Sequence, residues 1–204
     1  MEDVLTPNRR ERLVQLSFDG MEGGASAVID TSSNITTFEA LVENVDLIFE
    51  APADWDSRQS LLARLLGCVK IPSTEVKRYV HWNQDLPYTR NLVATDGKNY
   101  TLLILCWNSG RESRIHNHPC HGCFVLPLSG SIVETKYSVH PETDEIRQGA
   151  SRTYGAGQVT FMNDSIGLHK IGTTSESGAV SLHLYTPPFF NCKVFESSAF
   201  SSDA

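Results

Sequence analysis

Hydrophobic and polar residues follow two different periods along the chain. Between residues 36 and 70, apolar side chains recur at helical spacing, in one set from Phe38 and in a second from Leu61. After Ile71, short β-branched and aromatic runs are separated by turn sequences such as DGK, NSG and LSG. A helical period predicts amphipathic helices, and short runs bounded by turns predict strands. The pattern therefore predicts two helices at about 36–70, followed by a body that is mainly β.

The second part of the chain contains six runs with the length and composition of strands: TRNLVAT, YTLLILCW, HGCFVLPL, GSIVETKYSV, QVTFMN and AVSLHLYT. Their spacing is typical of an antiparallel barrel or sandwich. The stretch from 18 to 37 is rich in Gly, Ser and Thr, which predicts a flexible connection. We expect a flexible N-terminal segment at 1–35 and a single folded domain at 36–204 that includes the helices.

Length and charge limit the kinds of function. A chain of 204 residues can bury one substantial core. The net charge of -7 and the pI near 5.4 do not attract nucleic acid or an anionic membrane surface. The apolar runs are shorter than the ~20 residues that span a bilayer, and the start MEDVLTPNRRER lacks the apolar segment of an export signal. We expect a cytoplasmic monomer with a small ligand, and no nucleic-acid or membrane partner.

The densest group of chemically active residues is HNHPCHGC, which holds three of the seven histidines and two of the five cysteines. Three explanations compete: a closed zinc site that uses the Cys-x-x-Cys pair, a redox dithiol, or a metal bound by histidines, with the cysteines in other roles. His116 and His118 are two residues apart, so on a strand both side chains leave the same face and can hold one ion.

The surrounding stretch GRESRIHNHPCHGCFVLPLSG resembles the first motif of the cupin barrels, with Cys123 where a metal-binding glutamate usually stands. This resemblance implies a cupin-type jelly-roll β-barrel, with two or more N-terminal helices packed against it. A cupin site takes a further histidine from a later strand, and His169 in NDSIGLHKIG is the candidate, although its spacing departs from the usual second motif.

Two further runs carry polar residues on one face. In AVSLHLYTPP, Ser181, His183 and Tyr185 alternate with leucines. If this row faces inward, its side chains must form hydrogen bonds or take part in function, because an unpaired buried group costs about 1–3 kcal/mol. The alternative is that the row faces solvent. In DLPYTRNLVA, Tyr88 and Arg90 share a face if the run is extended. An arginine fork matches a carboxylate, although a surface arginine is the simpler explanation of Arg90 taken alone.

Together these segments resemble the cysteine dioxygenase family, of the type I eukaryotic form, with departures of a kind expected in fungal members. YTRNLV, LLILCWNSG, IHNH, NDSIGLH and AVSLHLYTPPF occur in the family's order over about residues 80–192. The resemblance implies one non-haem Fe(II) per chain, bound by His116, His118 and His169. It also implies addition of O2 to the thiolate of L-cysteine, which gives L-cysteine sulfinic acid.

The same resemblance implies roles for side chains around the metal. Arg90 and Tyr88 would bind the carboxylate of the substrate. Cys123 and Tyr185 would be joined by a thioether, a cofactor that the protein makes from its own side chains.

Further residues of the last motif would support Tyr185. Ser181 and His183 would orient its phenol through hydrogen bonds. The peptide bond between Thr186 and Pro187 would be cis. Tyr185, Cys123, His183 and Ser181 are therefore the expected catalytic group.

Two alternatives stay open from the sequence. The first is a related thiol dioxygenase that acts on 3-mercaptopropionate; Arg90 disfavours cysteamine, which has no carboxylate. The second is a structural zinc-binding module that uses Cys120, Cys123 and two histidines. The zinc module does not explain the polar row or the pair of Tyr88 and Arg90.

Overall fold

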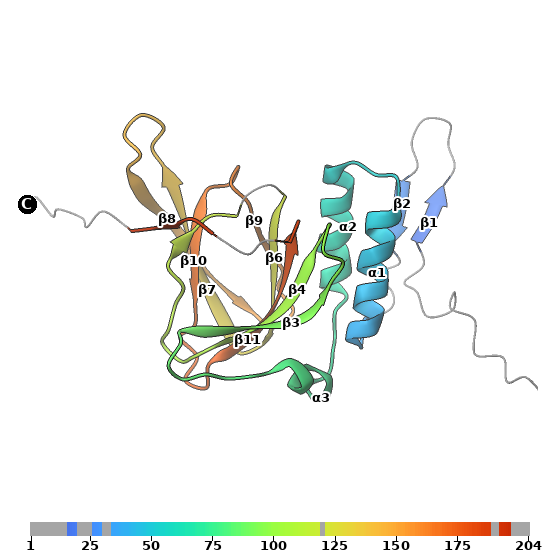
Figure 1. The fold of residues 1–204 in the computed structure, drawn as a ribbon, viewed down its shortest axis with the longest axis horizontal. Helices are drawn as coiled ribbons and strands as arrows, with labels where there is room; N and C mark the ends of the chain where they lie inside the picture. Colours follow the sequence, from blue (N-terminus) through green and yellow to red (C-terminus); the bar gives the residue numbers. More distant parts are fainter. Residues whose placement is uncertain (1–15, 20–25, 30–33, 119–120, 189–191, 197–204) are drawn as a thin grey trace, which may run out of the picture. The chain divides into compact units, whose positions relative to one another are not determined.

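The computed structural model describes residues 16–19, 26–29, 34–118, 121–188 and 192–196. The chain divides into two compact units, residues 1–76 and residues 77–204. The first unit carries the two long helices, and the second consists mainly of strands (Figure 1). Most of the segment 1–35, predicted to be flexible, lies outside the described residues, so the domain boundaries stay a prediction.

In the described part of the first unit, a strand pair precedes the helices. β1 (Leu16–Asp19) pairs with β2 (Ser26–Ile29) in antiparallel orientation. The helices are α1 (Phe38–Glu50), α2 (Trp55–Gly67) and the short α3 (Ser73–Val76). α1 and α2 confirm the helices predicted at about 36–70. Their apolar stripes are buried: Phe38, Leu41, Val45 and Ile48 in α1, and Leu61, Leu62, Leu65 and Leu66 in α2.

The ends of the long helices follow from local sequence. The Thr37 hydroxyl accepts the backbone N–H three residues later at 3.1 Å, and the Asp54 carboxylate does the same at 2.8 Å. These caps satisfy N–H groups that have no partner inside the helix. At the C-terminal end of α1, Arg58 of α2 donates to the carbonyl of Ala51 at 2.9 Å. A cation there also interacts favourably with the helix dipole.

The second unit begins with the 3-10 turn η2 (Lys77–Tyr79) and continues as two five-stranded antiparallel sheets. In order across the first sheet, the strands are β12 (Val194–Phe195), β5 (Ile115–His116), β10 (Leu168–Gly172), β7 (Ser131–Val139) and β8 (Ile146–Gly155). Across the second sheet they are β3 (Tyr88–Thr95), β4 (Thr101–Trp107), β11 (Ala179–Thr186), β6 (Gly122–Ser129) and β9 (Thr160–Met162).

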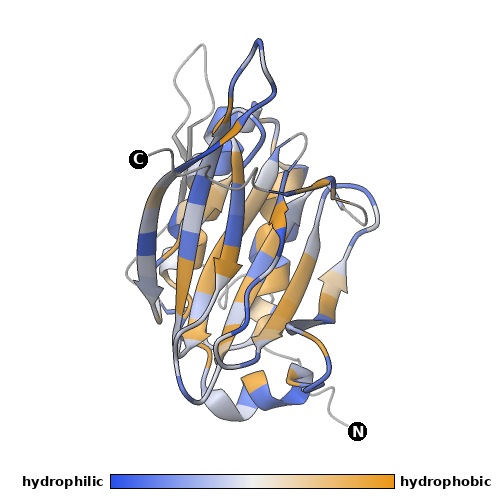
Figure 2. Cartoon of the chain, turned by 90° about the vertical axis from the view of Figure 1, so that its left-hand side faces the viewer, coloured by the Kyte–Doolittle hydropathy of each residue, from blue (hydrophilic) through white to orange (hydrophobic). Residues whose placement is uncertain are grey.

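One apolar cluster joins the two sheets. It includes Leu105 of β4 and Val125 of β6 from one sheet, and Ile132 of β7 and Ile171 of β10 from the other. Hydrophobic and hydrophilic residues alternate along several strands (Figure 2), as expected for strands with one face toward a core. This arrangement confirms the predicted fold class, a mainly β barrel of the cupin type with helices in the N-terminal part.

The six predicted strand runs are present. The short strands β1, β2, β5 and β12 were not among them, and neither was the longer strand β8. Its sequence IRQGASRTYG is mostly exposed and lies at the edge of its sheet, so it lacks the apolar alternation on which the prediction depended. The peptide bond Thr186–Pro187, directly after β11, is cis, as the resemblance implied. In the described part of the chain, no helix is long and apolar enough to cross a membrane.

Candidate active site

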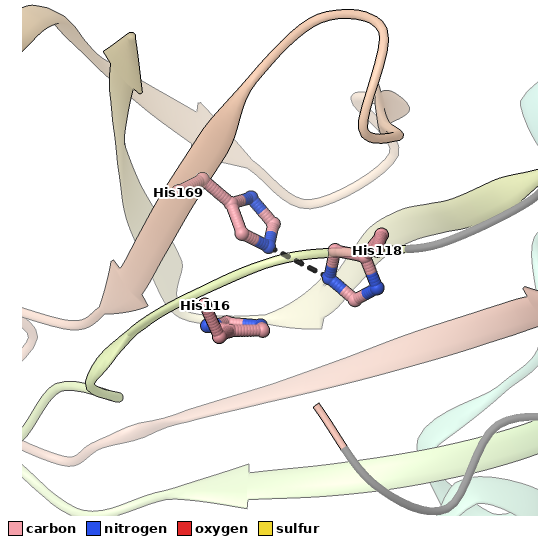
Figure 3. A group of neighbouring side chains, drawn as sticks. All are labelled: His116, His118 and His169. Atoms are coloured by element: carbon pink, nitrogen blue, oxygen red, sulfur yellow. Dashed lines mark hydrogen bonds between the residues drawn. The ribbon is translucent and has the colours of Figure 1, made fainter. Parts of the chain in front are cut away.

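Three histidines come together in the first sheet. His116 ends β5, His118 follows two residues later, and His169 in β10 pairs opposite His116. Figure 3 shows the three rings close together. Their centroids are 4.9 Å (His116 to His118), 4.7 Å (His116 to His169) and 4.8 Å (His118 to His169) apart. The Nε2 atoms of His118 and His169 are 2.8 Å apart. Among the described residues, these three side chains form a group able to hold a metal ion.

One pair of these donor atoms has the spacing of two ligands of a single ion. Two nitrogens bound at about 2.1 Å and at a right angle to each other are about 3.0 Å apart, which is close to the 2.8 Å between Nε2 of His118 and Nε2 of His169; all three donor atoms lie within 4.8 Å of one another. The Nδ1 atom of His116 is 2.9 Å from the carbonyl oxygen of Arg114, and that of His169 is 2.7 Å from Oε1 of Glu134. A carbonyl oxygen only accepts, so Nδ1 of His116 carries the proton and its Nε2 keeps a lone pair for a metal.

The surroundings favour the neutral form of all three imidazoles. Burial lowers the pKa of His116, His118 and His169, and the neighbouring histidines lower those of His118 and His169 further. The Arg90 guanidinium also lowers the pKa of His116 and His118. Because only a neutral imidazole offers a lone pair, the group can bind a metal at neutral pH without first losing protons.

The loop that carries His118 is held by Asp164. The Asp164 carboxylate accepts the backbone N–H of His118 at 2.9 Å and the side-chain amide of Asn117 at 3.0 Å. In return, the backbone N–H of Asp164 donates to the carbonyl of His118 at 2.9 Å. These bonds fix the position of His118 although it lies beyond the end of β5.

A row of hydrogen bonds lies along the inward face of β11. Ser181 and His183 are buried, and Trp107 Nε1 donates to the Ser181 hydroxyl at 2.8 Å. The same hydroxyl is 2.8 Å from His183 Nε2, and His183 Nδ1 is 3.5 Å from the Tyr185 oxygen. An indole N–H only donates, so the Ser181 oxygen accepts from Trp107 and its own proton can be donated to His183 Nε2; in that tautomer, Nδ1–H of His183 faces Tyr185.

Cys123 lies directly opposite Tyr185. The two residues are register partners between β6 and β11, and both are buried. Directly paired residues of antiparallel strands have Cβ atoms about 4.5–5.5 Å apart, so their side chains touch. Burial raises the pKa of the Cys123 thiol and of the Tyr185 phenol well above their ordinary values, so both keep their protons. Next to Cys123, Gly122 has a φ of +101°, and a side chain there would collide with the carbonyl of Met162.

Arg90 and Tyr88 lie beside this row. The Arg90 guanidinium carbon is 5.1 Å from the centroid of the Tyr185 ring, and Tyr88 packs against Trp107 with centroids 4.5 Å apart. Arg90 is exposed and Tyr88 is half-buried. Burial raises the pKa of Tyr88, while the Arg90 charge lowers it. An arginine guanidinium and a neutral phenol therefore lie together next to Tyr185.

The possible metal ligands found among the described residues are histidines and include no cysteine. Cys123 lies instead with its sulfur 3.8 Å from His183 Nδ1, and Cys120 lies outside the described residues. This arrangement therefore disfavours a zinc module that uses Cys123 as a ligand.

Sequence reasoning missed Glu134. It is only 1% exposed and contacts His169 directly. The available signal was its place in GSIVETKYSV, two residues after Ile132, which predicts that both share the inward face of β7. A carboxylate at a core position requires a partner, but the run does not say which one.

Comparisons with known proteins agree with this geometry. The family model for cysteine dioxygenase type I matches residues 26–198. The rat (Rattus norvegicus) protein "Cysteine dioxygenase type 1" is 41% identical over 111 residues, which are 53% of this chain and 56% of the rat protein. The human protein of the same name is 39% identical over 125 residues, 60% of this chain and 62% of the human protein. The matched segments thus span less than two thirds of these relatives.

Proposed function

This chain belongs to the cysteine dioxygenase type I family, and on that premise we propose that it converts L-cysteine and O2 into L-cysteine sulfinic acid. Both oxygen atoms are added to the sulfur, which supplies all the electrons that reduce O2, so the reaction needs no external reductant. The observation that carries this proposal is the group of three neutral imidazoles beside the buried pair of Cys123 and Tyr185.

The ligands of the proposed iron(II) are His116, His118 and His169. When bound, the ion would hold the cysteine thiolate and O2 side by side and provide the electronic route between them. Many non-haem iron oxygenases use two histidines and one carboxylate. Three neutral imidazoles instead leave the site more positive, which favours the deprotonated form of a substrate thiol.

Arg90 and Tyr88 are the proposed carboxylate-binding residues. The guanidinium can donate two parallel hydrogen bonds to a carboxylate, and the Tyr88 hydroxyl can add a third. Because Arg90 lies over the ring of Tyr185, a carboxylate held there brings the substrate next to that phenol. This is why we favour a thiol with a carboxylate over cysteamine.

Tyr185, with Ser181 and His183, is the proposed proton-holding group. His183 presents Nδ1–H to the Tyr185 oxygen, and the raised pKa of the phenol keeps the Tyr185 proton in place. The phenol can therefore donate a hydrogen bond to substrate oxygen or sulfur while the Ser181 hydroxyl fixes the orientation of His183.

We also propose a thioether between Cys123 and Tyr185. The new bond joins the cysteine sulfur to a carbon of the phenol ring, and it replaces one S–H and one ring C–H. The two hydrogen atoms leave to O2, the oxidant that the proposed reaction already uses. The direct pairing of these residues supports this step, because the side chains of register partners on adjacent strands are neighbours.

The reducing cytoplasm is the proposed location. Cys68, Cys106, Cys123 and Cys192 are free thiols in the described part of the chain, as expected for a reducing compartment. A monomer stays our prediction and can be checked by light scattering.

Oxygen uptake by the Fe(II)-loaded protein tests the proposal. The panel comprises L-cysteine, D-cysteine, cysteamine and 3-mercaptopropionate, with each product identified by mass spectrometry. We expect L-cysteine to give the highest kcat/KM and a product that gains both atoms of labelled O2. A higher value for 3-mercaptopropionate would reassign the substrate. Stoichiometric zinc with no uptake for any thiol would refute the enzymatic function.

A further inference from the structure

Glu134 is a buried carboxylate that takes no part in the reaction proposed above. Its Oε1 is 2.7 Å from Nδ1 of His169, and its Oε2 accepts the Thr160 hydroxyl at 2.8 Å. Burial raises the pKa of this carboxyl group, while the Thr160 hydroxyl, the Lys136 charge and Tyr154 act to lower the pKa. Both carboxylate oxygens are therefore bound, although the residue is only 1% exposed.

These contacts connect the two sheets. Glu134 in β7 pairs with Ile171 of β10, so His169 is its diagonal neighbour and within reach of a long side chain. Thr160 belongs to β9 of the other sheet, where β9 pairs with the strand that carries Cys123. The buried path from His169 through Glu134 to Thr160 thus ties the histidine cluster to the opposite sheet.

The contact with Glu134 also selects the tautomer of His169. A carboxylate oxygen accepts hydrogen bonds, and Thr160 already donates to the other oxygen, so Nδ1 of His169 must carry the proton. Its Nε2 then keeps the lone pair. This is the atom that lies 2.8 Å from Nε2 of His118. In the opposite tautomer, Nε2 would carry a proton and could not bind an ion.

We propose that Glu134 is a positioning residue of the metal centre: its carboxylate holds His169 with the Nε2 lone pair toward the ion. The inference rests on the proposed function only in that a metal is bound by the three histidines. Where a cupin has a glutamate ligand in its first motif, this chain has Cys123. Glu134 instead supplies a carboxylate that contacts the ligand His169 and does not bind the metal itself.

Metal binding in the absence of any thiol tests this role. Co(II) is titrated into the metal-free full chain in competition with a chromophoric chelator. Loss of a group that orients a metal-bound histidine weakens metal binding by about 10–100-fold. We expect Glu134→Ala to weaken Co(II) binding by this factor. Glu134→Gln keeps an oxygen that accepts from Nδ1 but has no charge, so its loss should be smaller. The matched control is Glu112→Gln, which neutralises an exposed carboxylate 2.7 Å from Lys170, next to His169 in sequence; its affinity should not change.

A second measurement separates positioning from a general effect on folding. Nitrogen-15 NMR of the imidazole rings in the metal-free protein should show His169 as the Nδ1–H tautomer. In Glu134→Ala, a mixture of tautomers is expected, while circular dichroism checks that the fold is kept. If both Glu134 variants fold and bind Co(II) as tightly as the wild type, the proposal is wrong.

The two proposals fail separately. A wild-type protein whose Co(II) affinity depends on Glu134, but which takes up no O2 with cysteine, refutes the dioxygenase function and supports the role of Glu134. A cysteine-oxidising wild type whose Glu134→Ala variant keeps its affinity and tautomer refutes the role of Glu134 alone.

Discussion

Replacing Ser181 by alanine tests whether the inward face of β11 carries one connected hydrogen-bond network. The Ser181 hydroxyl is 2.8 Å from both Trp107 Nε1 and His183 Nε2. These partners are only 2% and 3% exposed, so neither can turn to bulk water when the hydroxyl is removed. A buried polar group left without a partner costs about 1–3 kcal/mol. Two such groups are left, so we expect Ser181→Ala to lower the free energy of unfolding by about 2–6 kcal/mol.

A double-mutant cycle with Trp107→Phe isolates the first bond of the network. In the wild type, Trp107→Phe removes a satisfied donor. In the Ser181→Ala background, the indole N–H has already lost its acceptor. Trp107→Phe then also removes the cost of this unpaired buried N–H. The loss of apolar packing at position 107 is common to both backgrounds and cancels. Groups within one network couple by about 0.5–3 kcal/mol, and we expect at least about 1 kcal/mol here.

Urea unfolding of the metal-free protein, followed by circular dichroism, gives the free energies for the four proteins of the cycle. Ser131→Ala serves as a control, because the Ser131 hydroxyl is half-buried and bonds to the Ser175 hydroxyl at 3.2 Å, away from the histidines. Additivity of Ser181→Ala and Trp107→Phe within about 0.5 kcal/mol would refute the shared bond. The orientation of His183 toward Tyr185 would then lack its structural basis.

Three further predictions concern binding, pH dependence and the crosslink. Arg90→Gln removes charge-assisted bonds worth about 1.5–3 kcal/mol, and because Arg90 is exposed we expect the lower end, a fall of about 10-fold in kcat/KM for L-cysteine; an equal fall for cysteamine in the oxygen-uptake assay would contradict carboxylate binding. Burial, and then the nearby charges of His118 and Arg90, hold the pKa of His183 well below 6.5. The unfolded chain therefore binds this proton more readily, and the stability from neutral His183 is complete above about pH 6.5 and lost as the pH falls below it, by up to about 1.4 kcal/mol per pH unit. His116, His118 and His169 contribute a slope of the same sign, so His183→Asn should reduce the total slope in urea unfolding between about pH 6.5 and 4.5 by the share of one histidine; an unchanged slope would show that His183 is not held neutral. After turnover, intact-mass spectrometry should find a species about 2 Da lighter that is absent from Cys123→Ala and present in Cys106→Ala; its persistence without Cys123 would rule out the proposed thioether.

The helices, most of the strands and the faces on which strand residues lie could be predicted from the sequence because they depend on local periodicity, whereas the expected members of the site came from the family resemblance. The helices follow from apolar spacing and from caps such as Thr37 and Asp54, which act within one turn. Alternation along a strand places His183 and Tyr185 on one face wherever that strand lies. The polar strand β8 was missed for the same reason, since an exposed edge strand needs no apolar alternation.

The positions of these residues relative to one another were decided only by the tertiary structure. That Cys123 lies opposite Tyr185, and that His169 lies opposite His116, depends on the register between strands remote in the chain. Register is set by the packing of the whole barrel, because a shift of one residue turns every side chain to the other face. Glu134 shows this most clearly. Its burial could have been predicted from the run GSIVETKYSV, but its contact with His169 exists only because β7 and β10 pair so that the carboxylate reaches diagonally to the imidazole.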